Sequence, residues 1–193
     1  MFSFCIPTEF VFGSGALKSL HKYKLPGKKA LIVTTNGKSV KRCGYLDELE
    51  KQLRMAGSDF VIFDGIAPNP TTDNIMDAAA LVKSSACDYV IGFGGGSPMD
   101  SAKLIALVAT NPGNIWDYCQ KGSGGRKQPV NQPLPIVCIS TTAGTGSEAD
   151  NSGMVTNPIT NEKLGIGFQS LFPVLAVVDP ELMISVPPRL TAY

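Results

Sequence analysis

The chain has 193 residues, of which 44% are hydrophobic and 17% charged, and its formal net charge is +1. This composition is typical of an apolar globular protein with one large or two small domains, and it excludes an intrinsically disordered chain. The balanced charge predicts no nucleic-acid or anionic-membrane partner. No apolar run approaches the roughly 20 residues that a membrane-spanning helix needs.

Cysteine and histidine usage narrows the possible chemistry. The five cysteines form no Cys-x-x-Cys pair, and residues 1–5 lack the basic and apolar regions of a signal peptide. We therefore expect a cytoplasmic protein whose thiols are reduced and mostly buried. The single histidine, His21, lies in a lysine-rich stretch and is predicted to be on the surface.

The N-terminal stretch, residues 2–12, is rich in aromatic residues and alternates loosely, which predicts a strand or hairpin. A small helix is expected from Ala16. An exposed aromatic strand at a terminus can pair with the same strand of a second copy, which would give a homodimer. It can equally be an edge strand of its own sheet, and the sequence leaves both arrangements open.

From residue 28 onward, short apolar runs alternate with segments whose apolar residues have helical spacing. The runs predict buried strands, and the spaced segments predict helices. Their alternation predicts an α/β fold, with a Rossmann-like parallel sheet and helices on both faces. A β-hairpin is expected around the turn at residues 157–161. The predicted strands are residues 28–35, 60–63, 88–93, 134–140 and 174–178, and the predicted helices are residues 41–56, 72–84 and 98–109.

Three consecutive glycines at residues 94–96 follow the third predicted strand. They let the backbone turn tightly and approach a ligand closely. Ser97 is expected to cap the next helix, Pro98 to occupy its first position, and Asp100 to complete a capping box. Free N–H groups at such a helix start favour an anion, so we predict a pyrophosphate site. The alternative is a tight turn before a well-capped helix.

The fourth predicted strand ends in a second loop of small residues, residues 141–148. In an open α/β sheet such loops lie at the carboxyl ends of the strands, where ligands bind. Four hydroxyl side chains suit phosphate or ribose oxygens, and the alternative is a polar turn. Neither loop matches the Gly-x-Gly-x-x-Gly fingerprint or a P-loop. The hydroxyls belong to Thr141, Thr142, Thr145 and Ser147.

Two motifs resemble the signatures of the iron-containing, group III alcohol dehydrogenases. They are Gly-Gly-Gly-Ser-Pro-Met-Asp-Ser-Ala-Lys at residues 94–103 and Ser-Thr-Thr-Ala-Gly-Thr-Gly-Ser-Glu at residues 140–148. Residues 179–182 and 187–192 are similar to that family's interdomain segment. The resemblance implies the dehydroquinate-synthase-like fold, in which an α/β nucleotide domain precedes an all-helical metal domain. Residues 1–193 would form the nucleotide domain and end at the junction to the missing helical domain.

The resemblance also implies that a nicotinamide dinucleotide binds across both loops. Asn69 would lie near the nicotinamide, whereas Lys163 and Leu182 would lie around the ribose and adenine. The residues expected to hold the pyrophosphate are Gly95, Gly96 and Ser97. Those expected to line the phosphates and ribose are Thr141, Thr142 and Thr145. The further candidates for cofactor binding are Thr35, Gly94, Asp100 and Val155.

The residues at the end of the predicted strand 28–35 bear on the choice between NAD(H) and NADP(H). Members of the family that prefer NAD usually place an acidic residue there, which repels a 2′-phosphate. Residues 34–39 contain no carboxylate. Gly37, Lys38 and Ser39 can instead accept the phosphate through N–H, charge and hydroxyl, so NADP(H) is favoured over NAD(H). The alternative is that Lys38 is simply solvated.

The family's catalytic metal is held by one Asp and three His in the helical domain, beyond Tyr193. We therefore expect no catalytic and no metal-binding residue in this chain, and Fe²⁺ or another divalent metal only in the complete enzyme. That enzyme would transfer hydride between a small primary alcohol or aldehyde and the nicotinamide, and this chain alone is predicted to be inactive. One alternative is a noncatalytic nucleotide-binding or assembly module. Another is a related polyol (glycerol-type) dehydrogenase, which the wording of the two motifs disfavours.

Overall fold

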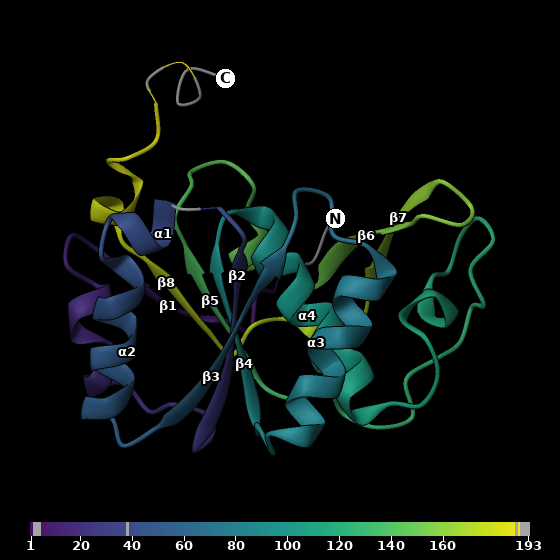
Figure 1. Ribbon diagram of the computed structural model, residues 1–193, viewed down its shortest axis with the longest axis horizontal. Helices are drawn as coiled ribbons and strands as arrows, with labels where there is room; N and C mark the ends of the chain where they lie inside the picture. The colour runs from purple at the N-terminus through teal and green to yellow at the C-terminus, as the bar shows by residue number, and fades with distance from the viewer. Residues whose placement is uncertain (2–4, 38, 188, 190–193) are drawn as a thin grey trace.

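A single parallel sheet organises the molecule (Figure 1). The computed structural model describes residues 1, 5–37, 39–187 and 189. Its six strands have the order β1-β8-β5-β4-β2-β3, and all neighbouring pairs are parallel. Strands β6 and β7 form a separate antiparallel hairpin beside helix α4. The predicted α/β fold and the predicted hairpin are both confirmed.

The elements follow one another in the alternating order that the sequence predicts. The strands are β1 (Glu9–Phe12), β2 (Lys29–Thr35), β3 (Asp59–Ile66), β4 (Tyr89–Gly94), β5 (Ile136–Ser140), β6 (Ser152–Asn157), β7 (Glu162–Gly167) and β8 (Leu175–Val178). The α-helices are α1 (Ser39–Arg42), α2 (Tyr45–Met55), α3 (Thr72–Ser84) and α4 (Gly96–Thr110). The 3₁₀ turns are η1 (Leu17–Lys22), η2 (Ile115–Tyr118), η3 (Ser147–Ala149), η4 (Gln169–Leu171) and η5 (Pro180–Met183).

Helices cover both faces of the sheet, so the sheet has two cores (Figure 1). Because successive side chains of a strand point to opposite faces, each central strand supplies both cores. Ile91 and Phe93 of β4 pack with α2 on one face of the sheet. Val90, which directly precedes Ile91, packs with α3 and α4 on the other face. Helix α4 is buried on almost every side because it lies between the sheet and the β6–β7 hairpin.

Several local predictions are wrong in detail. The helix predicted over residues 41–56 is two helices, because Gly44 adopts a left-handed conformation (φ 72°) between α1 and α2. Helix α3 is capped by Thr71, which lies one residue before the predicted start of the helix at residue 72. The small helix after Ala16 is a 3₁₀ turn. His21 is only partly exposed, and its Nδ1 lies 2.6 Å from Oε1 of Gln52.

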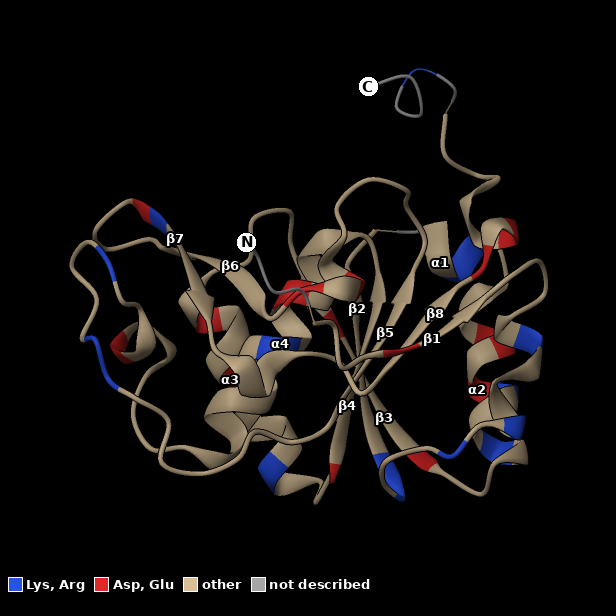
Figure 2. Cartoon of the chain, turned by 180° about the vertical axis from the view of Figure 1, so that it is seen from behind, with Lys and Arg blue, Asp and Glu red and all other residues tan. Residues whose placement is uncertain are grey.

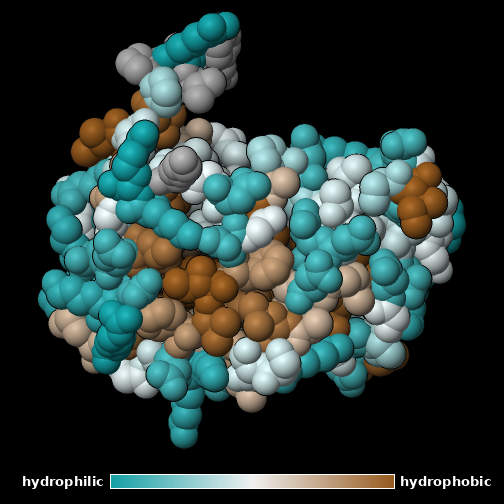
Figure 3. All heavy atoms as spheres, in the orientation of Figure 1, coloured by the Kyte–Doolittle hydropathy of each residue, from teal (hydrophilic) through white to brown (hydrophobic). Residues whose placement is uncertain are grey.

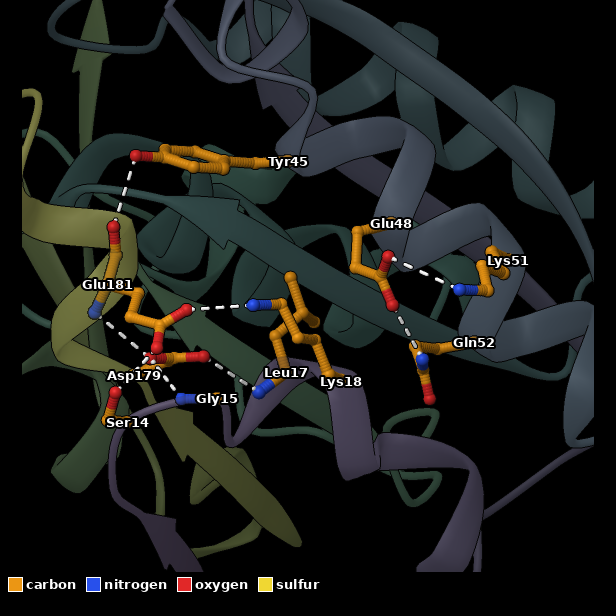
Figure 4. Close-up of polar contacts among 10 residues, drawn as sticks. All are labelled: Ser14, Gly15, Leu17, Lys18, Tyr45, Glu48, Lys51, Gln52, Asp179 and Glu181. Atoms are coloured by element: carbon orange, nitrogen blue, oxygen red, sulfur yellow. Dashed lines mark hydrogen bonds and ion pairs between the residues drawn. The ribbon is translucent and has the colours of Figure 1, made fainter.

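A buried carboxylate joins the start of the chain to the end of the sheet (Figure 4). Asp179 is 1% exposed and follows β8 directly. Its carboxylate accepts hydrogen bonds from the backbone N–H groups of Gly15, Leu17 and Glu181. The side chain of Asp179 therefore has three donors, which fix η1 and η5 to the same corner of the sheet.

The two edge strands differ in how they meet the surface. Strand β1 exposes Phe10 and Phe12, which are 44% and 75% accessible. The N-terminal segment is thus an edge strand of its own sheet, and residues 5–8 form no hairpin with it; residues 2–4 lie outside the described part. At the other edge, apolar side chains gather over β3, where residues 60–63 are half-buried (Figure 3). Charges of both signs alternate along the outer side of α2 (Figure 2).

Candidate functional site

The two small-residue loops lie side by side because the strands that precede them are neighbours. Gly94 ends β4 and is paired in register with Ser140, which ends β5. Both strands run the same way, so both loops leave from the carboxyl edge of the sheet. The N–H of Thr141 donates to the carbonyl of Gly94 at 2.9 Å and joins the loops at their base.

The start of helix α4 differs from the prediction. Gly95 is extended and precedes the first helical residue, Gly96, and no side chain caps the helix. Ser97 and Pro98 are therefore the second and third residues of the helix, and the predicted cap at Ser97 is wrong. Asp100 forms no capping box because it is directed to the β6 side of the helix. The first N–H groups of α4 are left for a ligand, as free helix starts are.

The gap between the loops has the shape and chemistry of a phosphate cradle. A Cβ atom added to Gly95 would meet Oγ1 of Thr142 at 3.3 Å, and one added to Gly96 would meet Cγ2 of Thr145 at 3.2 Å. Oγ1 of Thr142 is one of six buried side-chain polar atoms that have no hydrogen-bond partner among the described residues, and it faces Gly95. Buried hydroxyls normally have a partner, so this one fits an oxygen of a bound molecule. The pyrophosphate of a dinucleotide matches these groups.

A buried ammonium holds the end of the second loop and the start of β6 against helix α4. Lys103 of α4 is fully buried, and its Nζ donates to Oγ of Ser147 (2.9 Å), to the carboxylate of Asp150 and to the carbonyl of Ser152 (2.9 Å). Its three N–H donors thus match three acceptors in the segment between β5 and β6. A buried charge needs this full set of partners. Lys103 is not among the residues predicted for the site, although a lone lysine in an apolar helix is a signal for a buried polar contact.

Asp100 belongs to the same network and faces the cleft above it. Its carboxylate accepts from Oγ of Ser147 at 2.6 Å and from the N–H of Met154 at 3.0 Å. Burial raises the pKa of this carboxyl, and the hydrogen bonds from Ser147 and Met154 oppose that rise. The result is a carboxyl with a set orientation beside the start of α4.

A cleft of about 390 Å³ opens between α4, the second loop and the β6–β7 hairpin. It brings together seven of the residues that the sequence predicts for the site. At its rim, Nζ of Lys163 donates to Oδ1 of Asn69 at 2.6 Å, which joins two candidates 94 positions apart. The predicted residues that line the cleft are Asn69, Gly96, Ser97, Asp100, Thr145, Ser147 and Lys163, and the others that line it include Asp150, Ser152 and Met154.

Other candidates lie elsewhere. Val155 has its side chain in the core, and Met154 lines the cleft in its place. Leu182 is buried beside a second hollow of about 610 Å³ between η1, α2 and η5. Thr35, Gly37 and Ser39 lie at the end of β2 and the start of α1, and Lys38 lies outside the described residues.

Within the described part of the chain, no three His, Cys, Asp or Glu side chains converge as metal ligands do. The donor set for the metal that the family resemblance implies is therefore not found among these residues. No helix in the same part is long and apolar enough to cross a bilayer.

The parallel sheet, with its two loops side by side at the carboxyl edge, is an α/β domain of the Rossmann-like class. The chain belongs to the iron-containing alcohol dehydrogenase family, whose model, "Iron-containing alcohol dehydrogenase", matches residues 7–180. The predicted resemblance is thereby confirmed, and the match is to the N-terminal domain of these proteins.

Individual relatives agree with this assignment. The chain is 38% identical to the NAD-dependent methanol dehydrogenase of Bacillus methanolicus, with 99% of this chain and 49% of the relative covered. It is 34% identical to an NADPH-dependent aldehyde reductase of Escherichia coli, with 99% and 48% covered. The crystal structure of NADH-dependent butanol dehydrogenase A from Thermotoga maritima superposes with a TM-score of 0.91 at 32% identity, covering 100% and 48%. The chain thus spans about half the length of these relatives.

The Lys103 network predicts a large effect on stability. Lys103→Met is expected to lower the free energy of unfolding by about 3 kcal/mol, because it leaves Asp150 and Ser147 without their buried donor. Urea unfolding of the purified chain measures this. The matched control is Lys163→Met, at an exposed lysine of the same cleft, which is expected to change stability by less than about 0.5 kcal/mol. Equal effects of the two variants would contradict the supporting role of Lys103.

The raised pKa of Asp100 predicts a defined pH dependence. The unfolded carboxyl ionises near 3.8, so between that value and the higher folded pKa the folded state binds more protons. The contribution of Asp100 to stability is full below the unfolded pKa and is lost as pH rises through the folded pKa. Asparagine does not titrate. The stability advantage of the wild type over Asp100→Asn should therefore be larger at about pH 3.5 than at about pH 7 in urea unfolding. An advantage that grows with pH would contradict the assignment.

Proposed function

We propose that this chain is the cofactor-binding domain of an NAD(P)-dependent, metal-dependent alcohol dehydrogenase or aldehyde reductase. The observation that carries the proposal is the cradle between Gly95, Gly96, Thr142 and Thr145, with its buried partnerless hydroxyl. Residues 1–193 form this domain, and the complete enzyme adds a helical domain with the metal. The substrate is a small primary alcohol or aldehyde, as the names of the relatives suggest.

The residues of this chain bind and orient the cofactor. The N–H groups at the start of α4 and the hydroxyls of Thr142 and Thr145 hold the pyrophosphate, because both groups are donors aimed at an anion. The Lys163–Asn69 pair and Asp100 line the cleft beyond it. The nicotinamide supplies the hydride chemistry when it is bound. The protein's contribution is positioning and the exclusion of water.

The finer assignments belong to the same proposal. NADP(H) is the preferred cofactor, since residues 34–39 carry no carboxylate. The relatives include both an NAD-dependent and an NADPH-dependent enzyme. The enzyme works in the cytoplasm, which agrees with five free cysteines, three of them buried. It is a homodimer through the N-terminal strand. Support for the dimer comes from β1, which pairs with β8 on one side and exposes Phe10 and Phe12.

Cofactor titration tests the central proposal. Saturable binding of NADPH and NADH is expected, with NADPH tighter, as measured by nicotinamide fluorescence or calorimetry. Thr142→Val should weaken both about tenfold, because it removes a donor to a charged phosphate. It should leave the free energy of unfolding unchanged, since the hydroxyl has no partner within the described chain.

Controls separate binding from folding in that titration. Thr8→Val removes another buried, partnerless hydroxyl just before β1, and it should affect neither binding nor stability. Gly95→Val places a side chain against Thr142 and should abolish binding. A folded wild-type chain that binds neither nucleotide would overturn the proposal and favour the noncatalytic assembly module.

The dimer is tested separately by sedimentation. Phe12→Lys places a charge on the exposed face of edge strand β1. The sedimenting species is expected to change from a dimer to a monomer. The matched control is Ile159→Lys, at a 90% exposed residue of the β6–β7 turn, which should leave the mass unchanged. A monomeric wild-type chain would contradict this part of the proposal.

A further inference from the structure

Strand β7 carries Lys163 to the rim of the cleft, and a loop from elsewhere in the chain binds the other face of this strand. Successive side chains of a strand point to opposite faces, so Glu162 and Leu164 point away from Lys163. Ser123 donates to both oxygens of the Glu162 carboxylate, from its N–H to Oε1 at 3.2 Å and from its hydroxyl to Oε2. The two residues are 39 positions apart, so their contact ties the hairpin to the loop that follows η2 (Figure 1).

The surroundings of the Glu162–Ser123 contact are suited to it. Gly122 has a φ of 53°, and a Cβ atom at this position would overlap Oε1 of Glu162, so glycine allows the carboxylate to approach. The hydroxyl of Ser123 also accepts from Nε1 of Trp116 at 3.1 Å, and Trp116 is nearly buried. The hydrogen bonds from Ser123 hold the pKa of Glu162 below its usual value, so the carboxylate stays ionised. One serine thus joins the hairpin to a buried aromatic ring.

The contact lies at the start of β7, where the strand meets an exposed turn. Ile159 in this turn is 90% exposed, and strand ends beside such turns open most readily. Strand β6 is already held, because its backbone bonds to α4 and to the segment before α3. Lys163 directly follows Glu162 and reaches Oδ1 of Asn69 across the rim of the cleft. A long lysine side chain keeps one direction only where its backbone is fixed.

We propose that Glu162 is a positioning residue for the cofactor, an inference that rests on the proposed function. Its carboxylate points away from the cleft and acts through Lys163, whose ammonium donates to the bound dinucleotide. The Glu162–Ser123 contact fixes the start of β7, so the ammonium already faces the cleft before the cofactor binds. Binding then loses less side-chain entropy, because the lysine is ordered in advance.

A double-mutant cycle tests this role, with NADPH titrated into the full chain and followed by nicotinamide fluorescence. Lys163→Met is expected to weaken NADPH binding about fivefold, and Glu162→Ala about threefold. The double variant should bind NADPH as Lys163→Met does, because Glu162 acts only through that lysine. A purely structural role would instead give additive losses. Glu162→Gln keeps an acceptor oxygen for Ser123 and should lose less affinity than Glu162→Ala.

Further variants probe the contact from its other side and control for charge. Ser123→Ala removes the hydroxyl donor and should reproduce the effect of Glu162→Ala. Glu50→Ala removes the same charge from an ion pair of α2 and should leave NADPH binding unchanged. Trp116 is the one tryptophan of the chain and bonds to Ser123, so its emission reports on the contact. That emission should change in Glu162→Ala and Ser123→Ala, and stay unchanged in Lys163→Met.

The outcomes separate this inference from the proposed function. If the wild type binds NADPH but the losses in Glu162→Ala and Lys163→Met add, or if either change alone has no effect, the inference is wrong and the proposed function stands. An unchanged emission of Trp116 in Glu162→Ala would likewise overturn the inference alone. If the wild-type chain binds neither NADPH nor NADH, the proposed function is wrong and the inference falls with it.

Discussion

The buried ammonium of Lys103 is the interaction on which the candidate site depends. It contacts Ser147, Asp150 and Ser152, which lie 44 to 49 positions further along the chain. An ammonium inside an apolar helix is stable only with all of its acceptors in place, so the segment from η3 to β6 has a single position against α4. Ser147 in turn donates a hydrogen bond to Asp100, so the orientation of Asp100 also depends on Lys103. The loop before Ser147, which carries Thr142 and Thr145, ends at this fixed point.

The site handles negative charge in two different ways at its two ends. Between the loops, the donors are neutral N–H and hydroxyl groups, and the buried ammonium of Lys103 is already matched by its own acceptors. At the end of β2, Lys41 and Asp64 are charged, half-exposed and paired to each other. The first arrangement is rigid and suits a phosphate group common to every dinucleotide. The second lies in water, where an ion pair contributes little to stability.

Much of this could be predicted from the sequence, and the failures have physical causes. Apolar runs in strands such as β4 and β5 set the sheet, and the glycine and threonine loops indicated the cradle, because both signals are local. The cap at Ser97 was predicted wrongly because the pattern Ser-Pro-x-Asp satisfies the local rule, whereas Asp100 accepts instead from Ser147 of η3 and Met154 of β6. Asp64 could not be found beside β2, since its position depends on a bulge between two strands.

The position of β8 also has a consequence for how the chain is made. This strand lies between β1 and β5, and β1 has no other neighbour in the sheet. During synthesis from the N-terminus, residues 9–12 therefore remain without a strand partner until residues 175–178 have left the ribosome. Asp179, which joins η1 to that corner, emerges immediately afterwards. Residues 9–12 thus find their place in the sheet later than β2, β3, β4 and β5, and Phe10 and Phe12 stay accessible to chaperones until then.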